Sequence, residues 1–167
     1  MDIAMPPMTL LGWFHTIFGI AAVLFAASAL YRQGAISASD RVGKLYLIVT
    51  VIVAGSALGI YNQGGFGIAH ILAVLTLGAV AAGLIFEYGK IVGGLSAYCQ
   101  AICYSATVLF HMIPAITDFL RRLPVGDPFI DSFDSPVLQG FHLAFLTIYV
   151  FGVVVQCYRL KQARALL

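Results

Sequence analysis

The sequence predicts an all-α membrane protein that forms one domain, an antiparallel bundle of five transmembrane helices. Its 167 residues are 61% hydrophobic and only 10% charged, whereas soluble domains are about 45 to 50% apolar and about 25% charged. Five apolar stretches approach the length of about 20 residues that a helix needs to cross a bilayer. The net charge of +2 is too small for a nucleic-acid-binding surface. These observations exclude a soluble monomer and a nucleic-acid partner, and they leave membrane lipid as the surrounding medium.

The five predicted spans contain no Asp, Glu, Lys or Arg. They are residues 9–30, 45–61, 68–86, 91–113 and 137–157. The first span is expected to stay in the membrane, because no Lys or Arg precedes it and it exceeds the about 7 to 15 apolar residues of a signal peptide. The second is short, and we expect Lys44 and Tyr61 to anchor its two ends at the interfaces.

The joints between the spans predict how the helices are arranged. A segment with Gly, Ser and Asp separates the first two spans, and tight turns are predicted at residues 62–67 and 87–90. Short joints make sequential helices antiparallel neighbours. The long connection at 114–136 is expected to continue as a helix past Pro114 and then to form a cap on the outer membrane surface.

Small residues spaced four apart predict the faces on which these helices pack. In lipid, close approach of helix backbones depends on such residues. The sequence contains the pairs Gly55 and Gly59, Gly78 and Ala82, Ala79 and Gly83, and the strip Gly93, Ala97, Ala101 and Ser105.

The distribution of positive charge predicts the orientation. Two basic residues, Arg121 and Arg122, lie on one predicted side of the bundle. Seven lie on the other, namely Arg32, Arg41, Lys44, Lys90, Arg159, Lys161 and Arg164. Because positive residues near span ends are retained in the cytoplasm, we expect a bacterial inner-membrane protein with a periplasmic N-terminus and a cytoplasmic C-terminus.

Four histidines are the candidate functional residues. His15, His70, His111 and His142 lie in four different predicted spans, all in the half of the membrane that the predicted orientation turns outward. An intramembrane histidine is costly unless it faces the bundle interior and finds a partner, so it indicates a functional site. The alternative is that these rings are polar tips of an aromatic belt at the interface.

The chemistry of imidazole predicts a redox site. Two histidines on facing helices can ligate a b-type haem, and glycines at positions 12 and 19 beside His15 leave room for a flat macrocycle. Arg121 and Arg122 lie just beyond His111, where they can bind haem propionates. Several imidazoles can instead hold a transition metal ion, and a quinone pocket lined by His, Tyr and aromatic rings is a third alternative.

Three motifs in the first half of the chain carry a resemblance to a known family. They are His15 followed by Gly19, the segment Arg41-Val42-Gly43-Lys44-Leu45-Tyr46, and Gly64-Gly65-Phe66-Gly67-Ile68-Ala69-His70. Over residues 10–87 the sequence resembles a bacterial family of small predicted membrane proteins that carries a domain-of-unknown-function label. Its members usually have a His before the Arg of the first loop, where this chain has Asp40. The resemblance implies a membrane fold and location but no activity.

The function predicted from these features is redox chemistry at a histidine-lined site in the outer leaflet. The cofactor is predicted to be a b-type haem or, as the alternative, a transition metal ion, and a quinone is the predicted small-molecule partner. A function of another class is a non-catalytic accessory subunit that packs against a larger membrane complex or a second copy of the chain.

Overall fold

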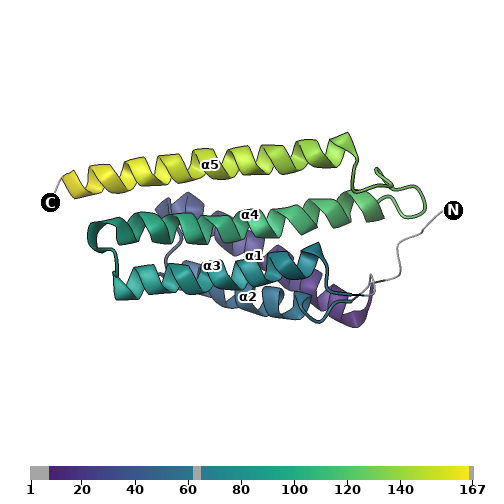
Figure 1. The fold of residues 1–167 in the computed structure, drawn as a ribbon, viewed down its shortest axis with the longest axis horizontal. Helices are drawn as coiled ribbons and strands as arrows, with labels where there is room; N and C mark the ends of the chain where they lie inside the picture. The colour runs from purple at the N-terminus through teal and green to yellow at the C-terminus, as the bar shows by residue number, and fades with distance from the viewer. Residues whose placement is uncertain (1–7, 62–64, 166–167) are drawn as a thin grey trace.

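The computed structural model describes residues 8–61 and 65–165, and within them the chain is helical, without a β-strand. Five long helices follow in chain order, α1 (Leu10–Gln33), α2 (Arg41–Ala57), α3 (Ile68–Leu84), α4 (Ser96–Arg122) and α5 (Pro136–Ala165). A π-helical turn, η1 (Ile85–Gly89), extends α3, and a 3-10 turn, η2 (Gly93–Leu95), precedes α4. The predicted all-α class is confirmed (Figure 1).

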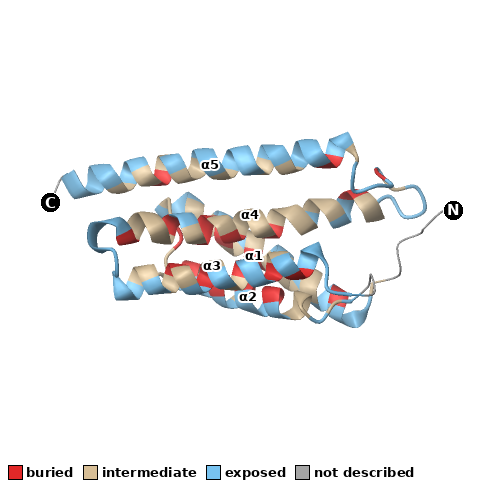
Figure 2. Ribbon diagram, viewed as in Figure 1, coloured by how far each residue is buried: buried red, intermediate tan, exposed pale blue. Residues whose placement is uncertain are grey.

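Helices α1 to α4 form a four-helix unit, and α5 lies outside it. α1 packs on α2, α2 on α3, α3 on α4, and α4 contacts α1 again, whereas α5 packs on α4 (Figure 1). Figure 2 shows the buried residues gathered within the four-helix unit and α5 exposed along most of its length. The buried residues of α5 are Leu138 and Gln156.

Four helical segments of the described chain are long and apolar enough to cross a membrane. They are Leu10–Gln33, Ile68–Gly89, Gly93–Arg122 and Pro136–Ala165. α2 has 17 residues and is therefore about 25 Å long at about 1.5 Å per residue, which is less than the hydrocarbon thickness of about 30 Å. The four-helix unit thus combines three long apolar helices with one short helix.

The start of α2 differs from the predicted span at 45–61 because a side chain caps it. The helix begins at Arg41, where the Asp40 carboxylate accepts hydrogen bonds from the amides of Val42 and Gly43 at 2.8 and 3.0 Å. Hydrogen bonds from the Gln33 side chain and from these amides keep the pKa of Asp40 below its usual value. A cap of this kind fixes the first turn of a helix whatever the hydropathy of its residues. The prediction from the apolar stretch therefore began the helix at residue 45, four residues after its actual start at Arg41.

The connection between α4 and α5 is shorter than the predicted cap at 114–136. α4 runs through Pro114 to Arg122, so the expected helical continuation is confirmed and residues 114–122 belong to the helix. The loop that follows folds back onto the helix ends. The Ile130 amide donates to the Leu120 carbonyl at 3.2 Å, and the Ile130 side chain packs with Leu120 and Leu138. The loop is therefore anchored on α4 and α5.

Small residues make the closest helix contacts inside the four-helix unit. Ala22, Ala26 and Ala29 of α1 are each at most 1% exposed. At Gly83 of α3, an added Cβ would overlap the Tyr104 ring, so the predicted face that contains Gly83 is used for packing. Gly78 is different, because it is exposed and an added Cβ would meet nothing within 4 Å.

Candidate functional site

Four hydrogen-bonded pairs of polar side chains follow one another along the four-helix unit. Their spacing is helical, with Tyr46 and Thr50 four residues apart on α2, and with Tyr104, Thr107 and His111 three and four residues apart on α4. Such spacing places the side chains on one face of each helix. We call the set the polar chain, and it consists of His15, Tyr46, Thr50, Ser56, Glu87, Tyr104, Thr107 and His111.

His15 of α1 forms one end of the polar chain, against α2. Its Nδ1 lies 3.1 Å from the Val53 carbonyl oxygen and 3.1 Å from Ser56 Oγ. The carbonyl only accepts, and Ser56 Oγ already donates to that carbonyl at 2.8 Å. The proton of the neutral ring is therefore on Nδ1, and the lone pair of His15 Nε2 is left to accept a proton or to bind a metal.

The middle of the polar chain joins α2 to α4. His111 Nε2 lies 3.1 Å from Thr50 Oγ1. One turn away on each helix, the Tyr46 hydroxyl lies 2.5 Å from Thr107 Oγ1, and the Thr107 hydroxyl donates to the Tyr104 carbonyl at 2.7 Å. Tyr46 is thus the donor to Thr107. Tyr46, Thr50 and Thr107 have no exposed surface, so these hydroxyl groups are fully enclosed and hydrogen-bonded within the protein.

Glu87 forms the other end of the polar chain, on the η1 turn after α3. Its carboxylate accepts the Tyr104 hydroxyl at 3.0 Å. The loop between α1 and α2 supplies the other donors, the hydroxyls of Ser37 and Ser39 at 2.6 and 2.9 Å and the amides of Ala38 and Ser39 at 2.9 and 3.0 Å. These hydrogen bonds compensate the negative charge and fasten the α1–α2 loop to α3 and α4.

Two of the four predicted histidines come together, and they are His15 and His111. Their hydrogen-bond partners on α2 lie close in sequence, at Thr50 for His111 and at Val53 and Ser56 for His15. The two imidazoles project from α1 and α4, and both hydrogen-bond to α2. This pair is the part of the predicted histidine site that the fold assembles.

His70 lies apart, at the start of α3. Its Nδ1 accepts the Gly67 amide at 3.1 Å, so the proton of the neutral ring is on Nε2. That Nε2 is buried and has no hydrogen-bond partner among the described residues. The ring centroid lies 4.7 Å from that of Tyr61 and 5.0 Å from that of Phe66. The contacts of His70 are those of a residue that caps a helix within an aromatic cluster.

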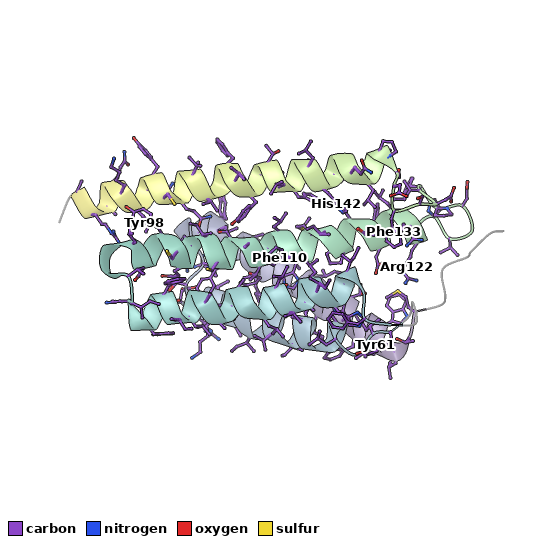
Figure 3. All side chains as sticks on the ribbon, in the orientation of Figure 1. Tyr61, Tyr98, Phe110, Arg122, Phe133 and His142 are labelled. Atoms are coloured by element: carbon purple, nitrogen blue, oxygen red, sulfur yellow. The ribbon has the colours of Figure 1, made fainter. Side chains whose placement is uncertain are left out.

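His142 and the two predicted arginines lie at the α4–α5 interface and its loop. His142 Nε2 lies 3.3 Å from Thr117 Oγ1 (Figure 3). The Arg121 guanidinium carbon lies 3.8 Å from the centroid of the Phe133 ring. Arg122 Nε lies 3.8 Å from a carboxylate oxygen of Asp118. Both arginines thus make contacts near their own helix end, and His142 contacts α4 separately from the His15–His111 pair.

The positions of the histidines bear on the predicted haem and metal sites. Within residues 8–61 and 65–165, no three His, Cys, Asp or Glu side chains form a group that could hold a metal ion. The four imidazoles occupy three places, since His15 and His111 are together and His70 and His142 are each separate. Haem and metal binding therefore stay predictions.

Most of the polar chain was not among the residues singled out from the sequence. Tyr46, Thr50 and Thr107 are single hydroxyl residues in apolar stretches, and such residues are common in membrane helices. Their spacing of about one turn, both on α2 and between Thr107 and His111 on α4, is the signal that could have found them. Glu87 was assigned to a turn, although it is an acidic residue at the very end of a predicted span.

Comparisons of the chain with protein-family models, with curated proteins and with solved structures found no match. The resemblance of residues 10–87 to a family of small membrane proteins therefore stays a prediction.

Proposed function

We propose that this protein is an integral membrane protein that transfers protons along the polar chain, between its His15–His111 end and its Glu87 end. The observation that carries the proposal is the row of four hydrogen-bonded polar pairs along the four-helix unit, in which Tyr46, Thr50 and Thr107 are fully enclosed. Polar and ionisable groups inside membrane helices are costly, and chains of Asp, Glu and His are typical of proton relays. A His pair at one end and a carboxylate at the other give such a relay two groups that exchange protons.

The hydrogen bonds define the steps of the proposed transfer. Hydroxyl groups both donate and accept. When Thr107 takes the Tyr46 proton, its own hydroxyl proton must turn from the Tyr104 carbonyl, which cannot pass a proton on, to a bridging water molecule. Tyr46 is then reprotonated from the Thr50 side. Along α2 and α4 the pairs Tyr46–Thr107 and Thr50–His111 are about one helical turn apart, or about 5.4 Å along the axis. One water molecule with two hydrogen bonds of about 2.8 Å spans that distance. Glu87 receives the proton from the Tyr104 hydroxyl side and exchanges it at the loop.

Reconstituted liposomes provide the test. The protein is inserted into vesicles that contain a pH-sensitive dye, and a potassium gradient with valinomycin sets a membrane potential. We expect wild-type vesicles to change their internal pH faster than protein-free vesicles. Thr107→Val and Glu87→Gln should return the rate to that of protein-free vesicles.

Matched variants outside the polar chain separate transfer from folding. Thr147→Val removes an exposed hydroxyl on α5 that bonds within its own helix, and Asp131→Asn changes an exposed carboxylate in the α4–α5 loop. Both should conduct like the wild type. If the wild-type protein conducts no faster than protein-free vesicles, the polar chain is a set of interhelical hydrogen bonds that hold the unit together, and the proposal is wrong.

A redox function at the same end of the polar chain is the second candidate. The specific observation in its favour is the hydrogen bond from His15 Nδ1 to the Val53 carbonyl, because the same arrangement orients imidazole ligands and leaves Nε2 for iron or another metal. We infer that a b-type haem, a metal ion or a quinone would meet His15 and His111 here. The polar chain would then supply protons to a quinone.

Absorption spectra test the redox candidate directly. A haem protein should show a Soret band, with a sharpened visible band after dithionite reduction. His15→Ala should abolish the spectrum, whereas His142→Ala, at the separate α5 site, should leave it unchanged. Featureless spectra together with a metal content below about one tenth of an ion per chain would remove haem and metal from the proposal.

The location proposed for the protein is a bacterial inner membrane, with a periplasmic N-terminus and a cytoplasmic C-terminus. The support is the excess of Lys and Arg at the end of the molecule where α1, α3 and α5 end. A C-terminal reporter that is active only after export should be inactive, and activity of that reporter would mean that the protein has the opposite orientation.

The exposed outer side of α5 also suits an accessory subunit. Such a subunit would copurify with a larger complex and would conduct no protons when it is reconstituted alone.

A further inference from the structure

A groove opens on the surface of the bundle between α2 and α3. Its volume is about 190 Å³, and its walls are mostly aliphatic side chains. Leu47 and Val51 come from α2, and Val80 and Leu84 come from α3. These residues lie inside the apolar part of their helices, so the groove is at the depth of lipid acyl chains. Its volume and apolar walls suit a stretch of one extended hydrocarbon chain.

The polar groups of the groove lie together at one end. Lys44 and Tyr88 line it there, and both side chains are exposed. Arg41 lies three residues before Lys44 on α2, and Lys90 lies two residues after Tyr88. This is the end of the molecule that carries most of the basic residues. With three basic residues against the two acidic residues Asp40 and Glu87, this end of the groove has a net positive charge.

Asp40 and Glu87 are the acidic residues nearest in sequence to this end, and the Asp40 carboxylate accepts two backbone amides as the cap of α2. Glu87 is likewise engaged within the protein. Its carboxylate is occupied by the hydroxyls of Ser37, Ser39 and Tyr104 and by two loop amides. Among residues 8–61 and 65–165 Lys44 forms no ion pair with an acid, and the ion pair found there is Arg122 with Asp118. The Lys44 ammonium is thus available to an external anion.

We propose that the groove binds an anionic phospholipid, with one acyl chain between α2 and α3 and the phosphate beside Lys44. The match is between an amphiphile with a negative head and an apolar groove with a positive end. The Lys44 ammonium pairs with the phosphate, and the Tyr88 hydroxyl donates a hydrogen bond to a headgroup or ester oxygen. This site is separate from the polar chain and does not depend on proton transfer.

Native mass spectrometry of the full-length protein in detergent tests the headgroup. The probes are phosphatidylglycerol and phosphatidylcholine with identical acyl chains. We expect one phosphatidylglycerol to be retained more strongly than phosphatidylcholine. Lys44→Gln should weaken phosphatidylglycerol binding about fivefold, the typical contribution of one basic residue near an anionic membrane surface. Lys161→Gln, an exposed lysine at the same end on α5, should leave the affinity unchanged.

A second pair of variants tests the acyl chain. Ile48→Trp fills the groove from α2, whereas Ile148→Trp places the same ring on the exposed surface of α5. The first should lower retention of both lipids, and the second should change neither. Equal retention of the two lipids, equal behaviour of Lys44→Gln and Lys161→Gln, or competition by inorganic phosphate alone would each overturn the proposed phospholipid site.

Discussion

The four-helix unit and α5 differ in how their polar side chains are arranged and buried. Inside the unit, Tyr46 and Thr107 are completely enclosed and hydrogen-bonded between α2 and α4. Along α5, polar contacts with α4 occur at separated positions, such as Gln156 with Ser105 and His142 with Thr117. The unit therefore encloses a row of hydrogen-bonded polar pairs, whereas α5 adds isolated polar contacts on one side of α4.

The difference shows what holds each region in lipid. Apolar surface gives little preference for another helix over lipid, so association depends on close packing and interhelical hydrogen bonds. The four-helix unit has both, since Gly83 admits the Tyr104 ring and Glu87 binds the α1–α2 loop. α5 is exposed over most of its surface (Figure 2). We expect variants inside the unit to cost much more free energy of unfolding than variants on α5.

Gly83→Ala should have the largest effect, an overlap cost of about 3 kcal/mol in the free energy of unfolding, of which the helix preference of alanine returns up to about 1 kcal/mol. An added methyl group overlaps the ring of Tyr104, which has no exposed surface, and overpacking of this kind costs about 1 to 3 kcal/mol. Reversible unfolding in mixed micelles measures the change. Because alanine favours helix formation by about 1 kcal/mol over glycine, a net loss identifies the overlap.

Two glycines serve as controls for Gly83. Gly78 lies on the same helix and Gly152 on α5, and a Cβ at either meets nothing within 4 Å. Alanine at these positions should raise the free energy of unfolding by up to about 1 kcal/mol, because it only adds the helix preference. Equal losses at all three positions would mean that Gly83 is not a tight contact and that the proposed difference between the two regions is wrong.

Glu87→Ala should follow, with a loss of about 2 kcal/mol, because hydrogen bonds to a charged group are worth about 1.5 to 3 kcal/mol. The variant leaves the Ala38 amide and the Tyr104 hydroxyl without their acceptor. Asp131→Ala, in the exposed part of the α4–α5 loop, is the control. Limited proteolysis should also cut the α1–α2 loop faster in the Glu87 variant, and an unchanged rate would show that Glu87 does not fasten it.

The sequence predicted the helices well because apolar length is a strong signal. The all-α class and the helical continuation past Pro114 agree with the structure. Helix ends were less accurate, since Asp40 begins α2 through a side-chain cap and the π-helical turn at Ile85–Gly89 carries Glu87 into the loop contacts. Hydropathy reports where lipid can surround a helix, but it does not report capping hydrogen bonds.

The candidate site was predicted only in part, for a different reason. All four histidines were predicted to form one site because they lie at a similar depth in the membrane. Depth alone does not determine the direction in which each ring points around its helix. His70 turns to its own helix start and His142 to α4. Tyr46 and Thr107, which are also part of the polar chain, come from α2 and α4. These helices are not consecutive in the sequence, and their side chains meet only after the unit has folded.

Thr107→Val should cost about 1 kcal/mol, because the Tyr46 hydroxyl loses its acceptor inside the unit. Valine keeps the shape of threonine, so packing changes little. Thr147→Val on α5 removes a hydroxyl of an exposed residue and should be neutral. Tyr46→Phe combined with Thr107→Val should recover part of the loss, since no buried hydroxyl is then left without a partner. A double variant as unstable as the sum of the single variants would contradict the pairing.

Gln156→Leu should have the smallest effect of this series, about 0.6 kcal/mol, the average for an interhelical hydrogen bond in a membrane protein. Gln156 and Ser105 join α5 to α4 at 3.0 and 3.1 Å. Leucine keeps a similar volume at this buried position, so most of the change reports the hydrogen bond. Ser105→Ala should give a similar loss, and the double variant should lose no more than either alone. A loss of free energy as large as that of Gly83→Ala would mean that α5 belongs to the core of the protein. One hydrogen-bonded contact between α5 and α4 cannot account for a loss of that size.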